Sequence, residues 1–477
     1  MAQLTFFGAV EGVTGSMYLL ETRKSRILID CGLFQGRREV EEANSRPFPF
    51  EADKINAVVL SHAHLDHSGR LPFLISEGYS QEIFMTSATC DLIEVLLKDA
   101  ASLQQRDAEW ENKRNKRAAK PLIEPLFTLE DVEKTLNHCR GVPYHQSYRI
   151  TDDVTIQFLD AGHILGSSIV LISINEEKKT KKLVFSGDLG NSQAALLKDP
   201  EVVNSAEVLL VESTYGDREH RSMSDTLKEF EEIIASATQN GGNILIPSFA
   251  VGRTQEIIFR LGELYQQGKL NRQVVYLDSP MAIAVTEIYH RYQNVYNRED
   301  ADAMKSVISV DREAEKRFHE KSLHRFLPIL RYTTSTAESI ALNRLESGGI
   351  FIAGSGMCNG GRIRHHLKHN LWRSKSHVVF VGFQAEGTPG RALIDGVKYF
   401  KIGGERIAVK AQIHTMGGFS AHASQRQLIE WLSNLEPSKT RLFLVHGEER
   451  AKQTLQTAVN EKGWSAQIPS LGETINF

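Results

Sequence analysis

The stretch SHAHLDHSG places three histidines and one aspartate, His62, His64, Asp66 and His67, within six positions directly after the apolar run INAVVL. Imidazole nitrogens and carboxylate oxygens suit zinc, and alternate residues of an extended loop can point two imidazoles at one ion. The next turn can then direct Asp66 and His67 at a second ion. The stretch indicates a site for two metal ions, although a chance histidine-rich turn or a structural site would read the same way.

Three later residues strengthen the metal interpretation, because each follows an apolar run that predicts a strand. They are His163 in TIQFLDAGHILGSS, Asp188 in KLVFSGDLG and His446 in RLFLVHGE. Taken alone, each is more often an ordinary turn residue than a ligand. Strand ends on one rim of a sheet sandwich can converge on a common point, so the same placement in all three favours metal ligands.

The elements that must hold these residues change along the chain. Up to about Asp160, short apolar runs between glycines and charged turns predict strands. After Ser205, apolar strands alternate with amphipathic helices, as in NILIPS followed by AVGRTQEIIFRLGELY, which predicts a mostly parallel sheet with helices on both faces. The last segment returns to the first style, with a helix at QRQLIEWLSNL and a strand at TRLFLVHGE.

A helical excursion is expected between Cys90 and Arg140, where Thr128 begins a capping box with Asp131. The charge-dense end of its first helix carries a basic cluster, which consists of Lys113, Arg114, Lys116, Arg117 and Lys120. A solvated helix surface is the commoner meaning of such a cluster, so no site is predicted there.

Composition limits the classes of protein. The 477 residues are 41% hydrophobic and 24% charged, typical of a folded protein, and the formal net charge of −3 means that any polyanion site must be built locally. The four cysteines form no CxxC pair, so neither a disulfide framework nor a cysteine zinc site is indicated. Without a signal peptide or an apolar run of roughly 20 residues, a cytoplasmic location and no membrane contact are expected.

Asp30 in LIDCG, the HAHLDH string, His163, Asp188 and His446, in this order, resemble the metallo-β-lactamase superfamily. The resemblance implies an αβ/βα sandwich with two zinc ions at one rim. One zinc would be held by His62, His64 and His163. The other would be held by Asp66, His67 and His446. Asp188 would bridge the two ions, and Asp30 would support the ligands from behind.

Two zinc ions about 3.5–4 Å apart make a bridging water acidic enough, with a pKa lowered towards about 7, to attack as hydroxide. The same ions neutralise charge on the non-bridging and leaving oxygens of a phosphodiester. The implied chemistry is hydrolysis, and the metal ions alone do not choose between ester, amide and phosphodiester.

Three further motifs resemble the β-CASP subgroup, nucleic-acid hydrolases with an α/β domain inserted into the sandwich. They are Glu212 in VLLVESTYGDR, the stretch GFQAEGTPGR at 382–391 and His422 in GGFSAHAS. The chain most resembles bacterial relatives of the endonuclease subunit that cleaves messenger RNA precursors for polyadenylation. The expected α/β fold has a metallo-β-lactamase domain at 1–210 and 413–477, with a parallel β-CASP domain inserted at 211–412. Members that act on RNA carry a histidine at the position of His446, which favours RNA over DNA.

The resemblance also implies three catalytic residues, Asp66, Glu212 and His422. Glu212 would hydrogen-bond His422 and hold it near the scissile phosphate, where a protonated imidazole assists departure of the ribose 3′ oxygen. Taken singly, Glu212 could equally be a surface acid. Relatives often read SAHxD here, whereas this chain has Ser424, which can cap the following helix but puts any role of that aspartate in doubt.

Three glycine- and arginine-bearing turns in the expected insertion fit a track for RNA phosphates, because backbone N–H groups at helix starts and guanidinium forks bind phosphate oxygens. The expected phosphate-binding residues are Ser248, Arg253, Ser355, Arg362, Gly387, Thr388 and Arg391. Glycine-rich turns are also common in α/β sheets, and without the metal site these would read as structural.

Together these features predict a zinc-dependent hydrolase, an endoribonuclease that cuts single-stranded RNA. One rival is a 5′-to-3′ exoribonuclease of the ribonuclease J type, which needs a pocket for a 5′ monophosphate. Another is a catalytically silent RNA-binding scaffold, which would be expected to have lost ligands, yet all seven positions are filled. RNA is the expected partner, and the sequence leaves a homodimer open.

Overall fold

The computed structural model describes residues 2–36, 38–176, 179–192, 194–270, 272–292, 326–385 and 387–477. The chain forms two compact units. The first contains Met1–Ser192, Asp199–Glu219 and His422–Phe477, and the second contains Gln193–Lys198 and His220–Ala421. The main segment of the second unit thus starts and ends slightly later than the insertion predicted over residues 211–412.

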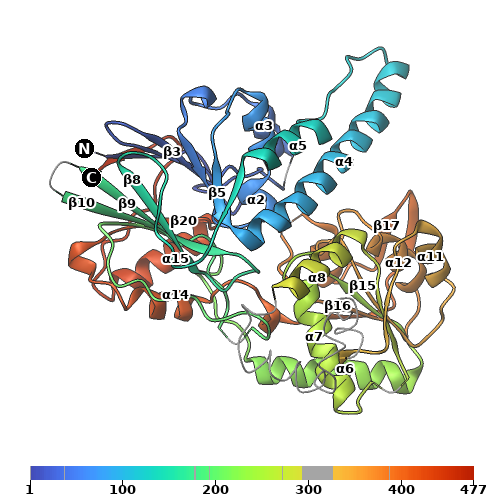
Figure 1. Cartoon of the computed structure of the whole chain (residues 1–477). Helices are drawn as coiled ribbons and strands as arrows, with labels where there is room; N and C mark the ends of the chain where they lie inside the picture. The colour runs from blue at the N-terminus through green and yellow to red at the C-terminus, as the bar shows by residue number, and fades with distance from the viewer. Residues whose placement is uncertain are drawn as a thin grey trace, which may run out of the picture. The chain divides into compact units, whose positions relative to one another are not determined.

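Two mixed sheets build the first unit (Figure 1). In spatial order, the strands of one sheet are β21 (Thr474–Asn476), β1 (Gln3–Phe6), β2 (Tyr18–Glu21), β3 (Arg26–Ile29), β4 (Ala57–Val59), β5 (Ile83–Thr86) and β6 (Cys139–Val142). Those of the other are β20 (Arg441–Val445), β11 (Val208–Glu212), β10 (Lys179–Phe185), β9 (Ser168–Glu176), β8 (Val154–Asp160) and β7 (Tyr148–Arg149). Strands β3 to β6 run parallel to one another, as do β10, β11 and β20.

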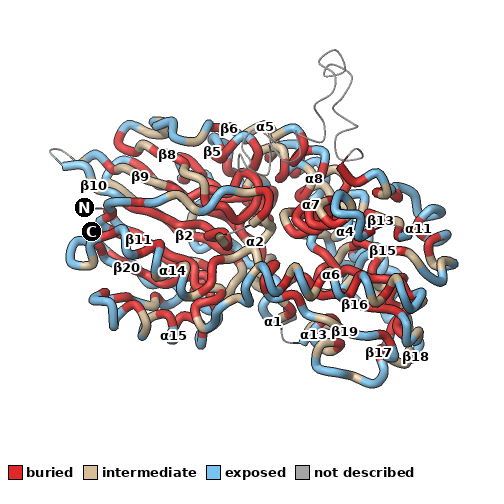
Figure 2. The backbone as a smooth tube through the Cα atoms, turned by 90° about the horizontal axis from the view of Figure 1, so that it is seen from below, coloured by how far each residue is buried: buried red, intermediate tan, exposed pale blue. Residues whose placement is uncertain are grey.

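The core of the first unit lies between these two sheets. Because successive side chains of a strand point to opposite faces, burial alternates along β8, where Val154, Ile156 and Phe158 are buried. Aromatic rings join the sheets: the Tyr18 ring lies 5.3 Å from that of Phe185. Each fully buried side chain of this size contributes about 1.5–3 kcal/mol. Figure 2 shows these central strands as buried segments.

Helices cover the outer faces of the sandwich. Helices α14 (Gln425–Leu432) and α15 (Glu449–Asn460) pack apolar residues such as Leu428 and Leu455 against β11 and β20. Helices α4 (Ser87–Arg117) and α5 (Leu129–His138) contact each other, and α4 contacts β5 and β6. The capping box predicted at Thr128 is confirmed, since its side chain accepts from the backbone of Asp131 while Asp131 accepts in return.

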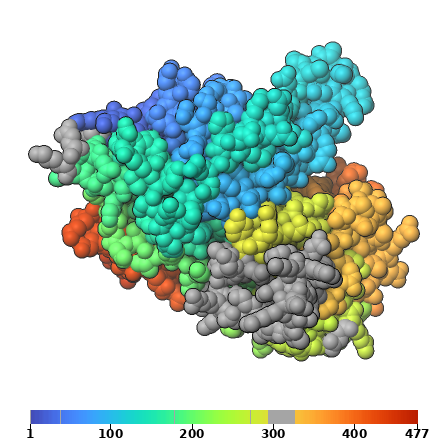
Figure 3. Space-filling view, in the orientation of Figure 1, coloured from blue at the N-terminus to red at the C-terminus, as the bar shows by residue number. Residues whose placement is uncertain are grey.

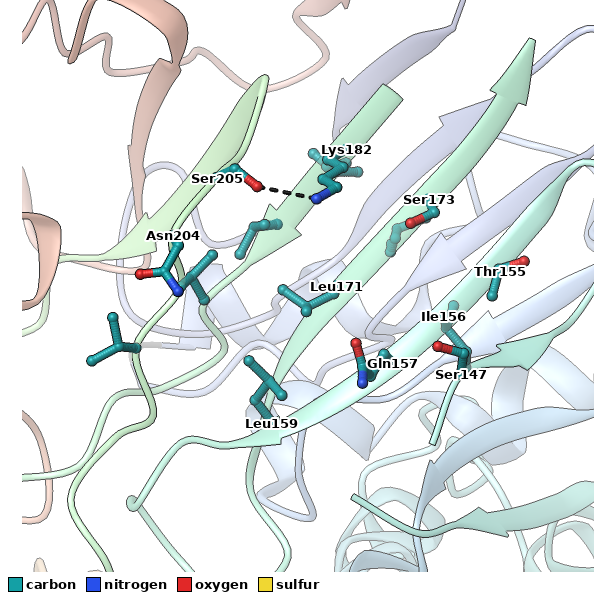
Figure 4. A pocket seen from close by; sticks show the side chains of 15 residues that line it. Ser147, Thr155, Ile156, Gln157, Leu159, Leu171, Ser173, Lys182, Asn204 and Ser205 are labelled. Atoms are coloured by element: carbon teal, nitrogen blue, oxygen red, sulfur yellow. Dashed lines mark hydrogen bonds between the residues drawn. The ribbon is translucent and has the colours of Figure 1, made fainter. Parts of the chain in front are cut away.

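A hollow of 450 Å³ lies on the outer side of β8, β9 and β10 (Figure 4). Its lining mixes aliphatic side chains such as Leu159 and Leu171 with small polar ones, and Lys182 donates to Ser205 across 3.1 Å. None of the residues predicted to bind metal or RNA lines this hollow.

The second unit is a parallel sheet with helices on both faces, as the alternation of strands and helices predicts. Its strands, in spatial order, are β14 (Leu330–Tyr332), β13 (Val274–Leu277), β15 (Gly349–Ala353), β12 (Ile244–Pro247), β16 (His377–Phe380) and β19 (Gln412–Thr415). Its helices include α6 (Met223–Asn240), α7 (Arg253–Gln266), α8 (Pro280–Arg291), α11 (Thr336–Leu342), α12 (Ile363–Asn370) and α13 (Pro389–Ile394). Separate apolar clusters lie on the two faces of the sheet. In the part of the chain that the structure describes, every helix is too short or too polar to cross a membrane.

A buried carboxylate links the elements of the second unit. Asp278, just after β13, is fully buried. It accepts four side-chain hydrogen bonds of 2.6–2.8 Å, from Thr333, Ser339, Arg362 and His366. Burial alone would raise the pKa of Asp278, but these donors, His366 foremost, lower it to about 2. The ionised carboxylate therefore ties β13 to α11 and α12.

Replacing Asp278 with alanine should lower the free energy of unfolding by about 3–5 kcal/mol at neutral pH, because Arg362 loses its buried partner. The native pKa lies below the unfolded one, so this contribution is present above about pH 4 and is lost as the pH falls towards about 2. Urea titrations of both proteins at several pH values measure the difference. The exposed Asp395, which pairs with Arg391, is a matched control whose alanine variant should change stability by less than about 1 kcal/mol. Equal stability of Asp278→Ala and wild type would contradict this role.

Candidate metal centre

The predicted metal ligands come together at one edge of the first unit because neighbouring parallel strands end there. Asp30 follows β3, and His62 lies shortly after β4, its parallel neighbour. In the other sheet, Asp188 follows β10, Glu212 is the last residue of β11 and His446 follows β20. His163 lies in the loop between β8 and β9. Asp66 and His67 belong to the short helix α2 (Leu65–Ser68).

Four side chains form the first ligand group: His62, His64, His163 and Asp188. The Nδ1 atom of His64 lies 3.1 Å from Nε2 of His62 and 3.2 Å from Nε2 of His163. Both Nε2 atoms lie 3.5 Å from Oδ2 of Asp188. A tetrahedron with metal–nitrogen bonds of about 2.0–2.1 Å has edges of about 3.3 Å, so this spacing fits a zinc ion.

The second group consists of Asp66, His67 and His446. The Nε2 atoms of His67 and His446 lie 3.1 Å apart, and Oδ2 of Asp66 lies 3.4 Å from Nε2 of His446. Oδ1 of Asp188 lies 3.3 Å from Nε2 of His67. The two oxygens of Asp188 therefore face different groups.

The chemistry of the donor set also fits a cation. Asp188 is 2% exposed, and its Oδ1 has no hydrogen-bond partner among the described residues. A buried acceptor left unsatisfied is costly, and a metal ion satisfies it. Burial lowers the pKa of His62 and of His64, which keeps these rings in the neutral state that binds metal. Burial alone would raise the pKa of Asp188, but His446 and His67 hold it well below its usual value.

Asp30 lies behind His67, one of the predicted ligands. Its fully buried carboxylate accepts from Nδ1 of His67 at 2.6 Å, from the hydroxyls of Ser16 and Ser61 at 3.0 Å and from the backbone of Ser61 at 2.8 Å. A ring that donates through Nδ1 presents its Nε2 lone pair to the site. Gly32 permits this arrangement, because a Cβ there would lie 1.6 Å from the carbonyl oxygen of Asp66.

Glu212 and His422 form a pair beside the ligands. Both carboxylate oxygens of the fully buried Glu212 lie 3.2 Å from Nδ1 of His422, so Nδ1 carries the proton. Burial would lower the pKa of His422, but the charge and hydrogen bond of Glu212 outweigh it and raise the pKa to about 9. The side chain of His422 is 21% exposed, and its Nδ1 is 3.9 Å from Asp188. The ring lies next to the ligand groups yet belongs to neither.

Ser424 caps α14, as expected, in a capping box with Gln427. Its hydroxyl also donates to Glu219 at 2.7 Å, and the other oxygen of Glu219 accepts from the backbone of Arg426 at 2.8 Å. A carboxylate at the start of this helix is therefore present although the sequence position after SAHA is a serine. It comes from a distant part of the chain, which the motif could not reveal.

The seven expected phosphate-binding residues lie in the three loops that follow adjacent parallel strands of the second unit, β12, β15 and β16, or in the first turn of the next helix, where Arg253 begins α7 and Arg391 lies in α13. The loops contact one another, since Gly390 donates to the carbonyl of Met357 at 3.0 Å. Thr388 caps α13, and Arg391 pairs with Asp395 on the surface. Ser248 and Arg253 are buried, and Ser355 is half-buried. Arg362 donates to Asp278 and to the carbonyls of Thr333 and Thr334, and its side chain is 21% exposed.

Phe249 lies among these loops and was not singled out by sequence reasoning. This aromatic residue is 40% exposed. A Cβ on Gly356 would lie 2.6 Å from the ring and one on Gly382 would lie 3.3 Å away, so two of the loops approach it closely. The motif SFAVGR contains the residue, but sequence alone does not tell an exposed ring from a buried one.

Replacing Asp30 with asparagine should weaken zinc binding about 10- to 100-fold, because His67 loses the charged acceptor that orients it. Asparagine keeps the shape and tolerates the φ of 57° at this position. Competition with a chromophoric chelator measures the affinity, with the exposed Asp53→Asn variant as control. Zinc affinity equal to that of wild type would show that Asp30 does not orient the ligand.

Comparison with known proteins matches three family models to successive parts of the chain. A metallo-beta-lactamase superfamily domain matches residues 19–214, a Beta-Casp domain residues 254–393 and a Zn-dependent metallo-hydrolase RNA specificity domain residues 406–469. A crystal structure of a protein of unknown function from Enterococcus faecalis shares the fold, with a TM-score of 0.54 and 13% identity over 99% of both chains.

Two curated relatives match almost the whole chain. Ribonuclease TTHA0252 of Thermus thermophilus is 39% identical over 471 residues, which cover 98% of each chain. Transcription termination factor FttA of Methanocaldococcus jannaschii is 31% identical over 94% of this chain and 67% of its own length. With the metal-binding geometry, these matches show that the chain belongs to the metallo-β-lactamase superfamily, in the branch that carries an inserted β-CASP domain.

Proposed function

We propose that this protein is a zinc-dependent endoribonuclease that hydrolyses phosphodiester bonds of single-stranded RNA with two zinc ions. A relative that carries the name ribonuclease supports a hydrolase that acts on RNA, as does the match to an RNA specificity domain of Zn-dependent metallo-hydrolases. Within the described residues, the seven predicted ligands fall in two groups that could each hold a metal ion, which supports an active hydrolase rather than a silent scaffold.

The observation that carries the proposal is the division of the Asp188 carboxylate. Oδ2 lies with His62 and His163, and Oδ1 lies with His67. A carboxylate shared in this way is suited to hold two cations close together. Zinc ions bound there supply Lewis-acid stabilisation of charge on a phosphodiester and lower the pKa of water towards about 7.

His422 is suited to donate the proton that the leaving oxygen needs. Glu212 accepts from Nδ1, so the ring is oriented and its protonated state is favoured at neutral pH. The departing ribose 3′ oxygen would otherwise leave as an alkoxide, and a positioned general acid typically contributes about 10²- to 10⁴-fold. Asp66 would act as a metal ligand in the second group, with His67 and His446.

The loops of the second unit are proposed to bind the RNA backbone and bases. Gly387 is exposed in the turn before α13, Thr388 caps that helix, and the exposed Arg391 supplies a cation. Phe249 presents a ring on which a base can stack, a contact worth about 1–3 kcal/mol per base. Arg253 is too buried to be the main cation of this surface.

Purified protein should contain about two zinc ions per chain by elemental analysis, and His64→Ala and Asp188→Ala should each contain less.

An endonuclease and a 5′-to-3′ exonuclease of the ribonuclease J type differ in whether they need a free RNA end. The wild type should cut a circular single-stranded RNA at a rate similar to that of its linear counterpart. Persistence of the circle while linear RNA is degraded would favour the exonuclease, and binding without cutting by zinc-loaded protein would favour the scaffold.

A second experiment separates the proton donor from the ligands. His422→Ala should keep both zinc ions and its RNA affinity but cut about 10²- to 10⁴-fold more slowly. His446→Ala should lose one zinc ion, because its imidazole is a ligand. RNA with sulfur in place of the 3′ bridging oxygen carries a leaving group that needs no proton, so it should partly rescue His422→Ala and not His446→Ala. Loss of metal from His422→Ala, or equal rescue of both, would show that the two roles are assigned wrongly.

A further inference from the structure

The end of α4 and the residues after it form a projection that the core of the first unit does not require. The buried residues of α4 end at Ala108, and the nine residues that follow in the helix are all at least partly exposed. We call residues 109–124 the arm. Figure 1 shows it extending beyond α5, and Figure 3 shows its end in cyan at the upper right. Ordering the arm costs conformational entropy, and the arm buries little apolar surface that could offset this cost.

We propose that the arm is a docking site for single-stranded RNA, separate from the metal centre and binding the same RNA molecule that is cut there. The inference rests on the proposed ribonuclease function.

The arm is built as an ordered surface rather than a loose loop. Asn112 exchanges two 2.8 Å hydrogen bonds with the backbone of Ile123, and Asn115 donates to the carbonyl of Pro121 at 3.0 Å. The backbone N–H of Lys120 donates to the carbonyl of Asn115 at 2.9 Å. These bonds fold the returning chain onto the helix, so binding a ligand there costs little ordering entropy.

The charge of the arm is suited to a polyanion. The arm holds five basic residues and three acidic ones, Glu109, Glu111 and Glu124, which gives it a net charge of +2 in a protein whose formal net charge is −3. All five basic residues and none of the acidic ones lie between Asn112 and Ile123. The basic residues are Lys113, Arg114, Lys116, Arg117 and Lys120. In the described part of the chain, none of the five has an ion-pair partner. Their charges are therefore available to phosphates.

Cations at the end of a helix also stabilise its dipole, which is the ordinary explanation for such a cluster. That effect is confined to the last turn and explains Arg114, Lys116 and Arg117 at most. It does not explain Lys113, Lys120 or the aromatic ring beside them. Trp110 is 62% exposed, and the guanidinium of Arg114 lies 5.0 Å from its ring centre. Basic side chains next to an exposed indole provide phosphate contacts and base stacking together, the combination used to bind single strands.

The start of α4 connects the arm to the metal centre. The hydroxyls of Thr86 and Thr89 donate to the carbonyl of Gly166 at 2.7 and 2.9 Å, in the same loop as His163. Helix α4 has 31 residues, about 45 Å at about 1.5 Å per residue, so the arm lies about 30–45 Å along the helix from that loop. An RNA that contacts both places must therefore extend well beyond the few nucleotides at the metal centre.

The test compares RNA lengths in the His422→Ala background, where cutting does not disturb binding. Lys116→Glu/Arg117→Glu should weaken binding of a single-stranded RNA of about 24 nucleotides by about 10-fold or more. The slope of log affinity against log salt should fall by about 1.4, because each phosphate contact on a single strand contributes about 0.7. Trp110→Ala should weaken binding of the same RNA by about 5-fold or more. An RNA of about three nucleotides is too short to contact both places, so the part of its binding that depends on bound zinc should be the same in all variants.

Lys439→Glu/Lys462→Glu is the matched control, since it reverses two exposed lysines elsewhere in the first unit and changes net charge equally. Fluorescence anisotropy gives the affinities, and thermal melting shows that each variant is folded. Unchanged affinity for the long RNA in both arm variants, or an equal loss in the control, would overturn the proposal. A change in oligomeric state by light scattering without a change in RNA affinity would assign the arm to a second copy of the chain instead.

Failure of the ribonuclease proposal is distinguishable from failure of this one. If the wild-type protein cuts neither linear nor circular RNA, the proposed catalytic function is wrong, whereas the anisotropy experiment still decides whether the arm binds RNA. If the wild type cuts RNA and variants with the same arm substitutions, made in a chain that keeps His422, cut long and short RNA as the wild type does, the arm is not a docking site.

Discussion

The structure of the first unit depends on a carboxylate that is buried among imidazole rings. Asp188 is 2% exposed, and its two oxygens face different sets of histidines. An isolated buried carboxylate is strongly unfavourable, and it persists when cations or protonated rings compensate it. The surrounding donors are imidazoles at distances that match the edges of a zinc coordination sphere. Holding several such rings around one carboxylate requires several chain segments to end within a few ångströms of each other, and the rest of the fold satisfies that requirement.

Parallel strands provide this convergence, because their carboxyl ends lie at one edge of a sheet. The sandwich has two sets of parallel strands, and both contribute to the site. The backbone is also strained at this site, because Asp30 and His446 adopt left-handed conformations with φ values of 57° and 50°. Such non-glycine conformations cost about 1–3 kcal/mol each and are retained where surrounding contacts determine them. For Asp30 those contacts are the serines and His67; for His446, Thr214 lies within 3.2 Å of Nδ1.

The second unit applies the same strand-end geometry to different chemistry. Its three glycine-bearing loops follow adjacent parallel strands and surround the exposed ring of Phe249. Its buried acid, Asp278, has no metal-ligand set among the described residues and is neutralised by Arg362 and other donors. A buried carboxylate thus organises each unit. In the first unit the partners of Asp188 are imidazole rings suited to a metal, whereas in the second unit the partners of Asp278 are side chains that donate hydrogen bonds to it. This difference separates a candidate catalytic centre from a structural network.

The sequence by itself determined the residue types of the metal site, the order of the motifs and the alternation of strands and helices in the second unit, since these depend on local spacing and on periodic burial. Tertiary structure decided which polar side chains meet. Glu219 caps the helix at Ser424 from a distant segment, and Arg362 donates to the buried Asp278, although its turn matched a phosphate-binding pattern equally well. The exposure of Phe249 and of Trp110 was likewise invisible, because the solvent accessibility of a ring depends on neighbours that are remote in the sequence. Local spacing limits the chemistry that a side chain can perform, but long-range packing decides which residue it contacts. A single motif contains only one of the two residues in such a contact.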